Sequence, residues 1–109
     1  MKKGEIWLFE LPLSDGHEQI GNRPGIIVSV SSTANTVIII PFTTNLQSLR
    51  FPFTLAVNPS KENELIEESV ALVFQIRAID KKRIIKQVGL LEIKHLREIE
   101  NMMKKLFGL

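Results

Sequence analysis

Short apolar runs separated by polar turns fill most of the chain, and they predict β-strands. Each run is rich in β-branched or aromatic residues, and the segments between them are rich in Gly, Pro, Asn, Asp and Ser. We predict strands over residues 5–11, 25–31, 36–40, 53–57, 69–79 and 84–88. Proline has no backbone N–H for a sheet ladder, so Pro12 and Pro41 are expected to end the first and third strands. Strands this short indicate a small, strongly bent antiparallel sheet or barrel.

A helical period governs the C-terminal end. Apolar residues recur there every three or four positions, at Ile93, Leu96, Ile99, Met103 and Leu106. Residues with this spacing share one face of a helix, so we predict an amphipathic helix over residues 92–107. A second, short helical turn is expected through Leu49, capped by the segment Thr43-Thr44-Asn45.

A long polar loop separates the first two predicted strands. It covers residues 14–24 and reads SDGHEQIGNRP. Long loops inside compact domains tend to be functional, which makes this segment the first place to look for a site. The chain contains no internal repeat and no linker rich in Gly, Ser or Pro, so we expect a single domain over residues 1–109.

Composition removes several classes of function. The absence of cysteine excludes disulfides, a thiol nucleophile and a cysteine-based metal site. The sequence has no Gly-rich phosphate loop, no histidine pair at metal-binding spacing and no acidic metal cluster, so we expect no metal and no cofactor. No apolar run approaches the roughly 18–20 residues of a membrane span, and the N-terminus lacks a signal peptide's apolar stretch. We therefore expect a cytoplasmic protein with no membrane partner.

Charge is distributed unevenly along the chain. Residues 1–80 carry six Lys or Arg against nine Asp or Glu, whereas residues 81–109 carry eight against three. A basic C-terminal third suits a polyanionic partner, but lysines on the solvent side of a helix also serve solubility. Charge alone does not select a partner.

The long loop contains three residues whose side chains suit phosphate binding or proton transfer, namely His17, Glu18 and Arg23. Arg23 precedes Pro24, which favours an extended backbone, and its guanidinium offers a planar set of donors to a phosphate. The alternative is a surface arginine or an ion pair with Glu18. An exposed His17 has a pKa suited to proton transfer, although most such histidines have no catalytic role.

Other polar residues lie at strand ends or within strands. Thr43 and Thr44 follow a strand, where a hydroxyl binds phosphate or caps the next turn. Gln75 and Arg77 lie on the longest predicted strand, and ion pairing is the expected state of an arginine in that apolar pattern. We assign three aromatic residues to the core rather than to a base-stacking platform, namely Phe42, Phe51 and Phe53.

Four segments occur in an order and spacing typical of one protein family. They are Lys3-Gly4-Glu5-Ile6-Trp7, Gly16-His17-Glu18-Gln19-x-Gly21-x-Arg23-Pro24, Ile39-Ile40-Pro41-Phe42-Thr43 and Gln75-Ile76-Arg77-Ala78-Ile79-Asp80-Lys81-x-Arg83. Together they resemble the MazF/PemK family of toxin endoribonucleases over nearly the whole chain. The resemblance implies a mainly β (α+β) fold, a small SH3-like antiparallel β-barrel with a C-terminal helix. It also implies a homodimer that cuts single-stranded RNA, and a cognate antitoxin partner.

The resemblance also assigns roles to individual residues. The family's functional arginine falls on Arg23, its active-site threonine on Thr43, and the loop histidine of some members on His17. In such a site Arg23 stabilises charge, Thr43 hydrogen-bonds the phosphate, and either His17 or Glu18 is the base, while the RNA's own 2′-hydroxyl attacks the phosphorus without a metal. Further RNA contacts are expected from Gln19, Asn22, Thr44, Gln75 and Arg77.

Two alternatives to an active nuclease stay open. Some family members carry an acid at the position of Phe74 and an arginine at that of Leu72, so one family route to acid–base catalysis is absent here. The first alternative is therefore a catalytically weak or inactive relative that binds RNA or an antitoxin. The second is a gyrase-poisoning toxin on the same barrel, because a shared fold does not fix function.

Overall fold

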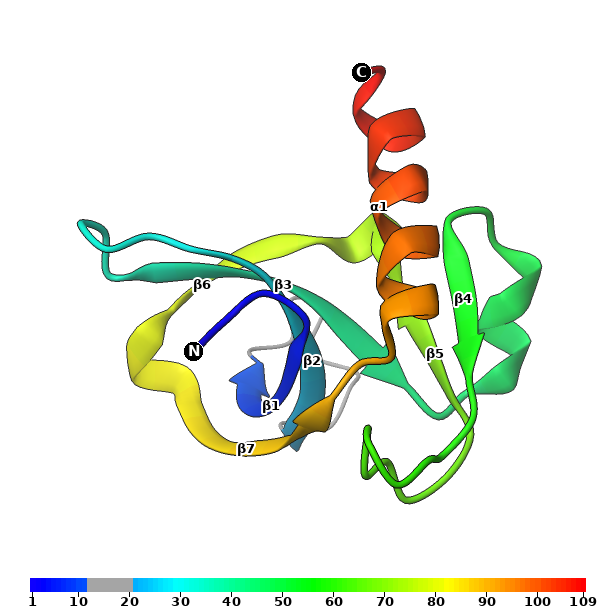
Figure 1. The fold of residues 1–109 in the computed structure, drawn as a ribbon, viewed down its shortest axis with the longest axis horizontal. Coiled ribbons are helices and arrows are strands. Elements are labelled where there is room, and N and C mark those ends of the chain that lie inside the picture. Colours follow the sequence, from blue (N-terminus) through cyan, green and yellow to red (C-terminus); the bar gives the residue numbers. More distant parts are fainter. Residues whose placement is uncertain (12–20) are drawn as a thin grey trace.

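The computed structural model describes residues 1–11 and 21–109, which form a bent antiparallel sheet with one α-helix packed against it (Figure 1). The strands are β1 (Glu5–Leu11), β2 (Gly21–Val30), β3 (Thr36–Thr43), β4 (Thr54–Val57), β5 (Ser69–Leu72), β6 (Arg77–Asp80) and β7 (Ile84–Leu90). The helices are α1 (Ile93–Phe107) and three short 3₁₀ helices, η1 (Leu46–Arg50), η2 (Val73–Gln75) and η3 (Lys81–Arg83). No helix in these two ranges is long and apolar enough to span a membrane.

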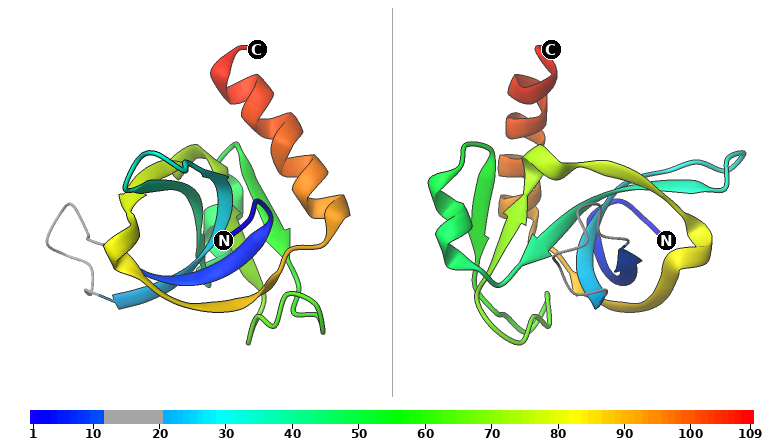
Figure 2. Two further views of the ribbon diagram at one scale, coloured as in Figure 1. Left: turned by 60° about the vertical axis from the view of Figure 1, so that its left-hand side comes forward. Right: turned by 180° about the vertical axis from the view of Figure 1, so that it is seen from behind.

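The sheet bends around β3, which changes neighbour along its length. Its first half, Thr36–Ile39, pairs with β6, and its last residues, Phe42 and Thr43, pair with β5. The remaining order is β3-β2-β1-β7, so the strands curve round an interior that Figure 2 shows end-on. The predicted mainly β, α+β class is confirmed. The sheet is not closed, since β6 and β7 are joined in the described chain by η3 and not by a ladder.

Pro41 does not end the third strand, which corrects the sequence prediction. β3 continues through Pro41 to Thr43. The reason is the change of neighbour: Ile39 is the last residue paired with β6 and Phe42 the first paired with β5, so Pro41 lies in the gap between them. A proline is tolerated where a strand has no ladder on one side.

The longest predicted strand, residues 69–79, is two strands. β5 ends at Leu72, η2 follows, and β6 begins at Arg77. The apolar run continues across this break because residues 69–73 are all buried, so the pattern gives no sign of the turn. β2 is also longer than predicted and begins at Gly21, because residues 21–24 pair with β1 rather than forming a loop.

Other local predictions are confirmed. β1 covers 5–11, β7 begins at Ile84, and α1 covers 93–107 within the predicted 92–107. Asn45 caps η1, as its Oδ1 accepts a hydrogen bond from the backbone N of Gln47 at 3.1 Å.

Two apolar clusters hold the fold together. One lies between the sheet and α1 and includes Ile6, Phe42 and Ile99. The other fills the inside of the bend and includes Phe9 and Val37.

The three predicted core aromatics do not share one environment. Phe42 is buried as predicted and Phe53 is half-buried, but the core assignment of Phe51 is wrong, since its side chain is 44% exposed. Phe51 follows η1, a helix with no buried residue, and so it lies outside both clusters.

Candidate active site

Pairing of β1, β2 and β3 positions Arg23 and Thr43, the two residues whose side chains are best suited to bind a phosphate. Arg23 lies opposite Phe9 of β1, and on the other side β2 pairs with β3 from Gly25↔Pro41 onward. Continuing that antiparallel register by two residues brings Arg23 level with Thr43. The strand extension that the sequence analysis missed is therefore what carries Arg23 to Thr43.

Arg23 and Thr43 line one cavity of about 220 Å³. Its walls are formed by Asn22, Arg23, Pro24, Phe42, Thr43, Thr44 and Ser69. Four of the site residues predicted from the sequence, Asn22, Arg23, Thr43 and Thr44, are thus brought together. Ser69 is a lining residue that the sequence analysis did not single out, because in the sequence it is only the first residue of a strand.

The Thr43 hydroxyl is oriented by its own turn. Its Oγ1 accepts a hydrogen bond from the backbone N of Asn45 at 3.2 Å, in the turn that leads to η1. The capping role considered for this residue is therefore present. A hydroxyl has two acceptor positions and one proton, so this contact leaves the proton available to a phosphate oxygen.

Arg23 is half-buried beside this hydroxyl. Within residues 1–11 and 21–109, none of the ion pairs involves Arg23, whose side chain lines the cavity. A planar guanidinium binds two phosphate oxygens at once, which a lysine does not do. The arrangement suits a phosphodiester.

A second, larger cavity of about 560 Å³ adjoins the first. Both are lined by Pro24, Thr44 and Ser69. The second cavity adds Lys86 and Gln87 from β7 and residues 64–67 from the loop after β4. The sequence gives no local signal for these, although the pairing of Leu8 with both Pro24 and Lys86 explains why β7 reaches this place.

The loop that lines the second cavity is anchored to the start of α1. Asn63 is fully buried, and its Nδ2 donates to Oε1 of Glu92 at 3.1 Å. Partial burial raises the pKa of Glu92, but hydrogen bonds from its own backbone N–H and from Asn63 outweigh that effect, and the net pKa is lowered. The ionised carboxylate therefore stabilises the loop.

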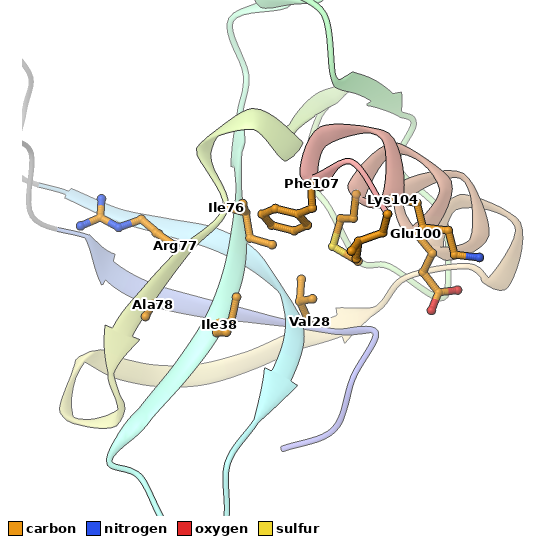
Figure 3. A pocket seen from close by; sticks show the side chains of 10 residues that line it. Val28, Ile38, Ile76, Arg77, Ala78, Glu100, Lys104 and Phe107 are labelled. Carbon is orange, nitrogen blue, oxygen red and sulfur yellow. The ribbon is translucent and has the colours of Figure 1, made fainter.

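Gln75 and Arg77 do not reach the cavity of Arg23 and Thr43. Gln75 is exposed on η2, and Arg77 is exposed on β6, which pairs with the opposite half of β3. The predicted ion pair of Arg77 is absent from the described residues. Figure 3 shows its guanidinium pointing away from Ile76 and Phe107.

Arg77 instead borders an apolar groove between the sheet and the C-terminal part of α1. The groove encloses about 480 Å³ and is lined by Val28, Ile38, Ile76, Ala78, Met103 and Phe107 among others.

His17, Glu18 and Gln19 lie outside the described residues, so their predicted roles stay predictions.

Comparison with known proteins gives consistent matches. A model of the family described as "PemK-like, MazF-like toxin of type II toxin-antitoxin system" matches residues 2–107. The protein named "Endoribonuclease MazF" of Staphylococcus saprophyticus is 32% identical over 113 residues, which cover all of this chain and 92% of that protein. Its counterpart in Staphylococcus epidermidis is 30% identical with the same coverage.

Solved structures share the fold. MazF (Form-I) from Deinococcus radiodurans aligns with a TM-score of 0.79 at 22% identity, covering 100% of this chain and 97% of that one. The MazE-MazF (Form-II) structure from the same organism aligns with a TM-score of 0.76 at 21% identity, covering 100% and 96%.

Proposed function

Because the chain belongs to the PemK-like, MazF-like toxin family of type II toxin–antitoxin systems, we propose that it is a toxin endoribonuclease that cuts single-stranded RNA. Two relatives at 32% and 30% identity carry the name endoribonuclease. The observation that carries the proposal is the shared cavity of Arg23 and Thr43, which joins a phosphate-binding guanidinium to a hydroxyl donor.

The proposed reaction uses the RNA's own 2′-hydroxyl. Its oxygen attacks the adjacent phosphorus, the bond to the 5′-oxygen breaks, and the products are a 2′,3′-cyclic phosphate and a 5′-hydroxyl. Arg23 stabilises the charge that develops on the phosphoryl oxygens, and Thr43 donates a hydrogen bond to one of them. The remaining rate enhancement comes from orientation, because the bound RNA is held with its 2′-hydroxyl in line with the bond that breaks. The reaction needs no metal, and it needs the 2′-hydroxyl, so DNA is at best an inhibitor.

The base that takes the 2′ proton belongs, in this proposal, to the pair His17 and Glu18. Among the described residues, the acids Glu64 and Glu67 line the adjoining cavity. RNA contacts at the cavity are assigned to Asn22 and Thr44.

We also assign RNA contacts to Gln19, which lies outside the described residues, and to Gln75 and Arg77. The last two lie too far along the sheet to touch the scissile phosphate. We assign Gln75 and Arg77 to contacts with nucleotides further along the RNA.

Two protein partners belong to the proposal. One is a cognate antitoxin, supported by the MazE-MazF assembly of the structural relative. The other is a second copy of the chain, supported by the apolar groove beside α1, where Phe107 is 56% and Ile38 38% exposed. Such a toxin acts on RNA in the cytoplasm.

A second candidate function is RNA or antitoxin binding without efficient cleavage. It is favoured by Phe74, which stands where some family members carry an acid. Phe74 is 39% exposed on η2, so a carboxylate at this position has little burial to overcome. A folded Phe74→Asp variant that cuts RNA faster than the parent supports the second candidate, whereas one that gains nothing leaves the mechanism with a base from the loop standing.

The test of the main proposal is incubation of single-stranded RNA with the purified protein in EDTA. We expect cleavage with cyclic phosphate and 5′-hydroxyl ends, and none of an all-2′-O-methyl RNA. A requirement for added divalent metal, or 5′-phosphate products, contradicts the proposed chemistry. A parallel gyrase supercoiling assay is expected to show no inhibition, and inhibition without RNA cleavage would support a gyrase poison.

A further inference from the structure

Two exposed phenylalanines contact each other at one end of the β4–β5 pair. Phe51 and Phe74 are 44% and 39% exposed, and their ring centroids are 5.9 Å apart at an interplanar angle of 56°. The Arg50 guanidinium lies over the Phe51 ring, 5.0 Å from its centroid. We call Arg50, Phe51 and Phe74 the aromatic cluster. It belongs to neither apolar core cluster.

Backbone hydrogen bonds hold the aromatic cluster in place. The N of Phe51 donates to Ser48 O at 3.1 Å, and Thr54 Oγ1 donates to Phe51 O at 2.9 Å. The N of Phe74 donates to Phe53 O at 3.3 Å, which ties η2 to the turn before β4. The rings are therefore presented to solvent by a fixed backbone.

Phe53, between these two anchors, has a φ of 58°, in the left-handed region. This conformation is uncommon for a bulky residue, and backbone strain of this kind tends to occur at functional sites. Here the strained residue is the one whose carbonyl accepts the hydrogen bond of Phe74. The strained backbone of Phe53 thus lies beside the two exposed rings of Phe51 and Phe74.

The chemistry of the aromatic cluster matches an unpaired nucleic-acid base. Burial of a phenylalanine ring is favourable, and two exposed rings leave part of that free energy unrealised. Proteins that bind single-stranded RNA stack bases on aromatic rings and on arginine planes, and place cationic groups near the backbone phosphates. Two rings and one guanidinium at one place supply both elements.

The aromatic cluster and the candidate active site are connected through strand β5. Thr43 pairs with Val70 of β5, and Phe74 follows four residues later. With rises of about 3.3 Å per strand residue and about 2 Å per 3₁₀ residue, the backbone between Val70 and Phe74 spans about 11 Å. A base at the aromatic cluster therefore belongs to a nucleotide near the scissile phosphate, but not to that phosphate itself.

We propose that Arg50, Phe51 and Phe74 form a stacking platform for an unpaired base of the RNA strand that passes through the cavity of Arg23 and Thr43. The inference rests on the proposed function for its substrate class. It extends the substrate contacts beyond the cavity and gives Phe74 a role of its own.

The first experiment measures affinity for a fluorescein-labelled single-stranded RNA of mixed sequence with 2′-O-methyl groups throughout, which cannot be cut. Phe51→Leu and Phe74→Leu keep an apolar side chain but remove the ring. Each is expected to weaken binding about 5- to 30-fold, within the range for losing one stacked base. Ile93→Ala is the control, because it removes an exposed apolar side chain of α1 that lines neither the two cavities nor the groove, and it is expected to bind like the parent.

The second experiment reads stacking directly. Phe74→Trp is expected to keep the affinity and to show quenching of its added indole fluorescence by bound RNA. Ile93→Trp, at an exposed position of α1, is the control and is expected to show none. Arg50→Gln should reduce the slope of log affinity against log salt by about 0.7, the value for one phosphate contact with a single strand.

Unchanged RNA affinity in folded Phe51→Leu and Phe74→Leu variants overturns the platform. If these variants instead lose dimer mass or antitoxin binding, the aromatic cluster is a protein contact and the inference is wrong. Cleavage is measured separately on unmodified RNA. If the parent protein cuts RNA and the leucine variants bind RNA normally, only the platform is refuted. If the parent binds RNA through these rings but never cuts it, only the nuclease proposal is refuted. A parent that neither binds nor cuts refutes both.

Discussion

Asn63 and Glu92 lie 29 residues apart in the sequence, yet their side chains are joined by a hydrogen bond of 3.1 Å from Nδ2 to Oε1. The Oδ1 of Asn63 accepts from the backbone N of Ser60 at 2.9 Å and of Leu65 at 3.0 Å. One buried amide therefore organises the loop that lines the second cavity and attaches it to Glu92, the N-cap residue of α1. Gly89 passes so close that an added Cβ would lie 2.3 Å from the Asn63 carbonyl oxygen.

Replacing Asn63 should destabilise the protein strongly. In Asn63→Ala, the buried backbone N–H groups of Ser60 and Leu65 lose their acceptor, at a cost of about 2–3 kcal/mol in the free energy of unfolding. Urea unfolding followed by circular dichroism measures this value. Asn101→Ala, at an exposed position of α1, is the control and should stay within about 0.5 kcal/mol of the parent. Equal stabilities would show that the loop does not depend on the amide.

Glu92 should make stability depend on acidic pH. Its pKa is lowered in the folded state, so the ionised form favours folding. That contribution is complete above the unfolded value of about 4.3 and is lost as pH falls through the folded value. The parent should therefore lose more stability than Glu92→Gln between about pH 5 and pH 3, as measured by thermal unfolding across that range. Parallel curves for the two proteins contradict this assignment.

Arg23 should be essential for cleavage and dispensable for folding. Arg23→Ala removes the charge donor at the phosphate, and the cleavage rate is expected to fall by about 10²–10³. Thr43→Val removes a hydroxyl donor and should also slow cleavage, whereas Thr43→Ser should retain most of the rate. Single-turnover cleavage of one RNA gives these values. Arg97→Ala, on the exposed side of α1, is the matched control. A folded Arg23→Ala protein that cuts at the parental rate excludes Arg23 from the site.

The pH dependence of cleavage should identify the base. A histidine base gives a rate that rises through about pH 6–7, and a carboxylate base gives a rise near about pH 4–5. His17→Ala and Glu18→Ala, measured separately on the same RNA, divide the role between them. Glu67→Gln tests the acid that lines the adjoining cavity. If the His17 and Glu18 variants both keep the parental rate and profile, the base lies elsewhere.

The protein should be a dimer in solution. Light scattering at micromolar concentration is expected to give twice the chain mass of 12.4 kDa. Phe107→Asp places a charge in the apolar groove beside α1 and should shift the mass towards the monomer. Ile85→Asp, an exposed site on β7 outside the groove, should leave the dimer intact. A monomeric parent contradicts the expected homodimer.

The sequence by itself determined the elements whose signals are local. The helical period of Ile93, Leu96 and Ile99 predicts α1, and Asn45 caps η1 through a contact two residues away. These features depend on neighbours within one or two turns of chain, so a linear pattern contains them. The ordered motifs likewise led to the family and to Arg23 and Thr43.

The tertiary structure alone decided which distant segments meet. The apolar pattern of residues 69–79 cannot show that β3 changes partner from β6 to β5, which breaks that run at η2 and turns Phe74 outward. Nor does any local signal bring Ser69 and Lys86 to the cavities beside Arg23. Period and capping are properties of a chain segment, whereas partner choice is settled by the packing of the whole sheet, and the site is formed by that choice.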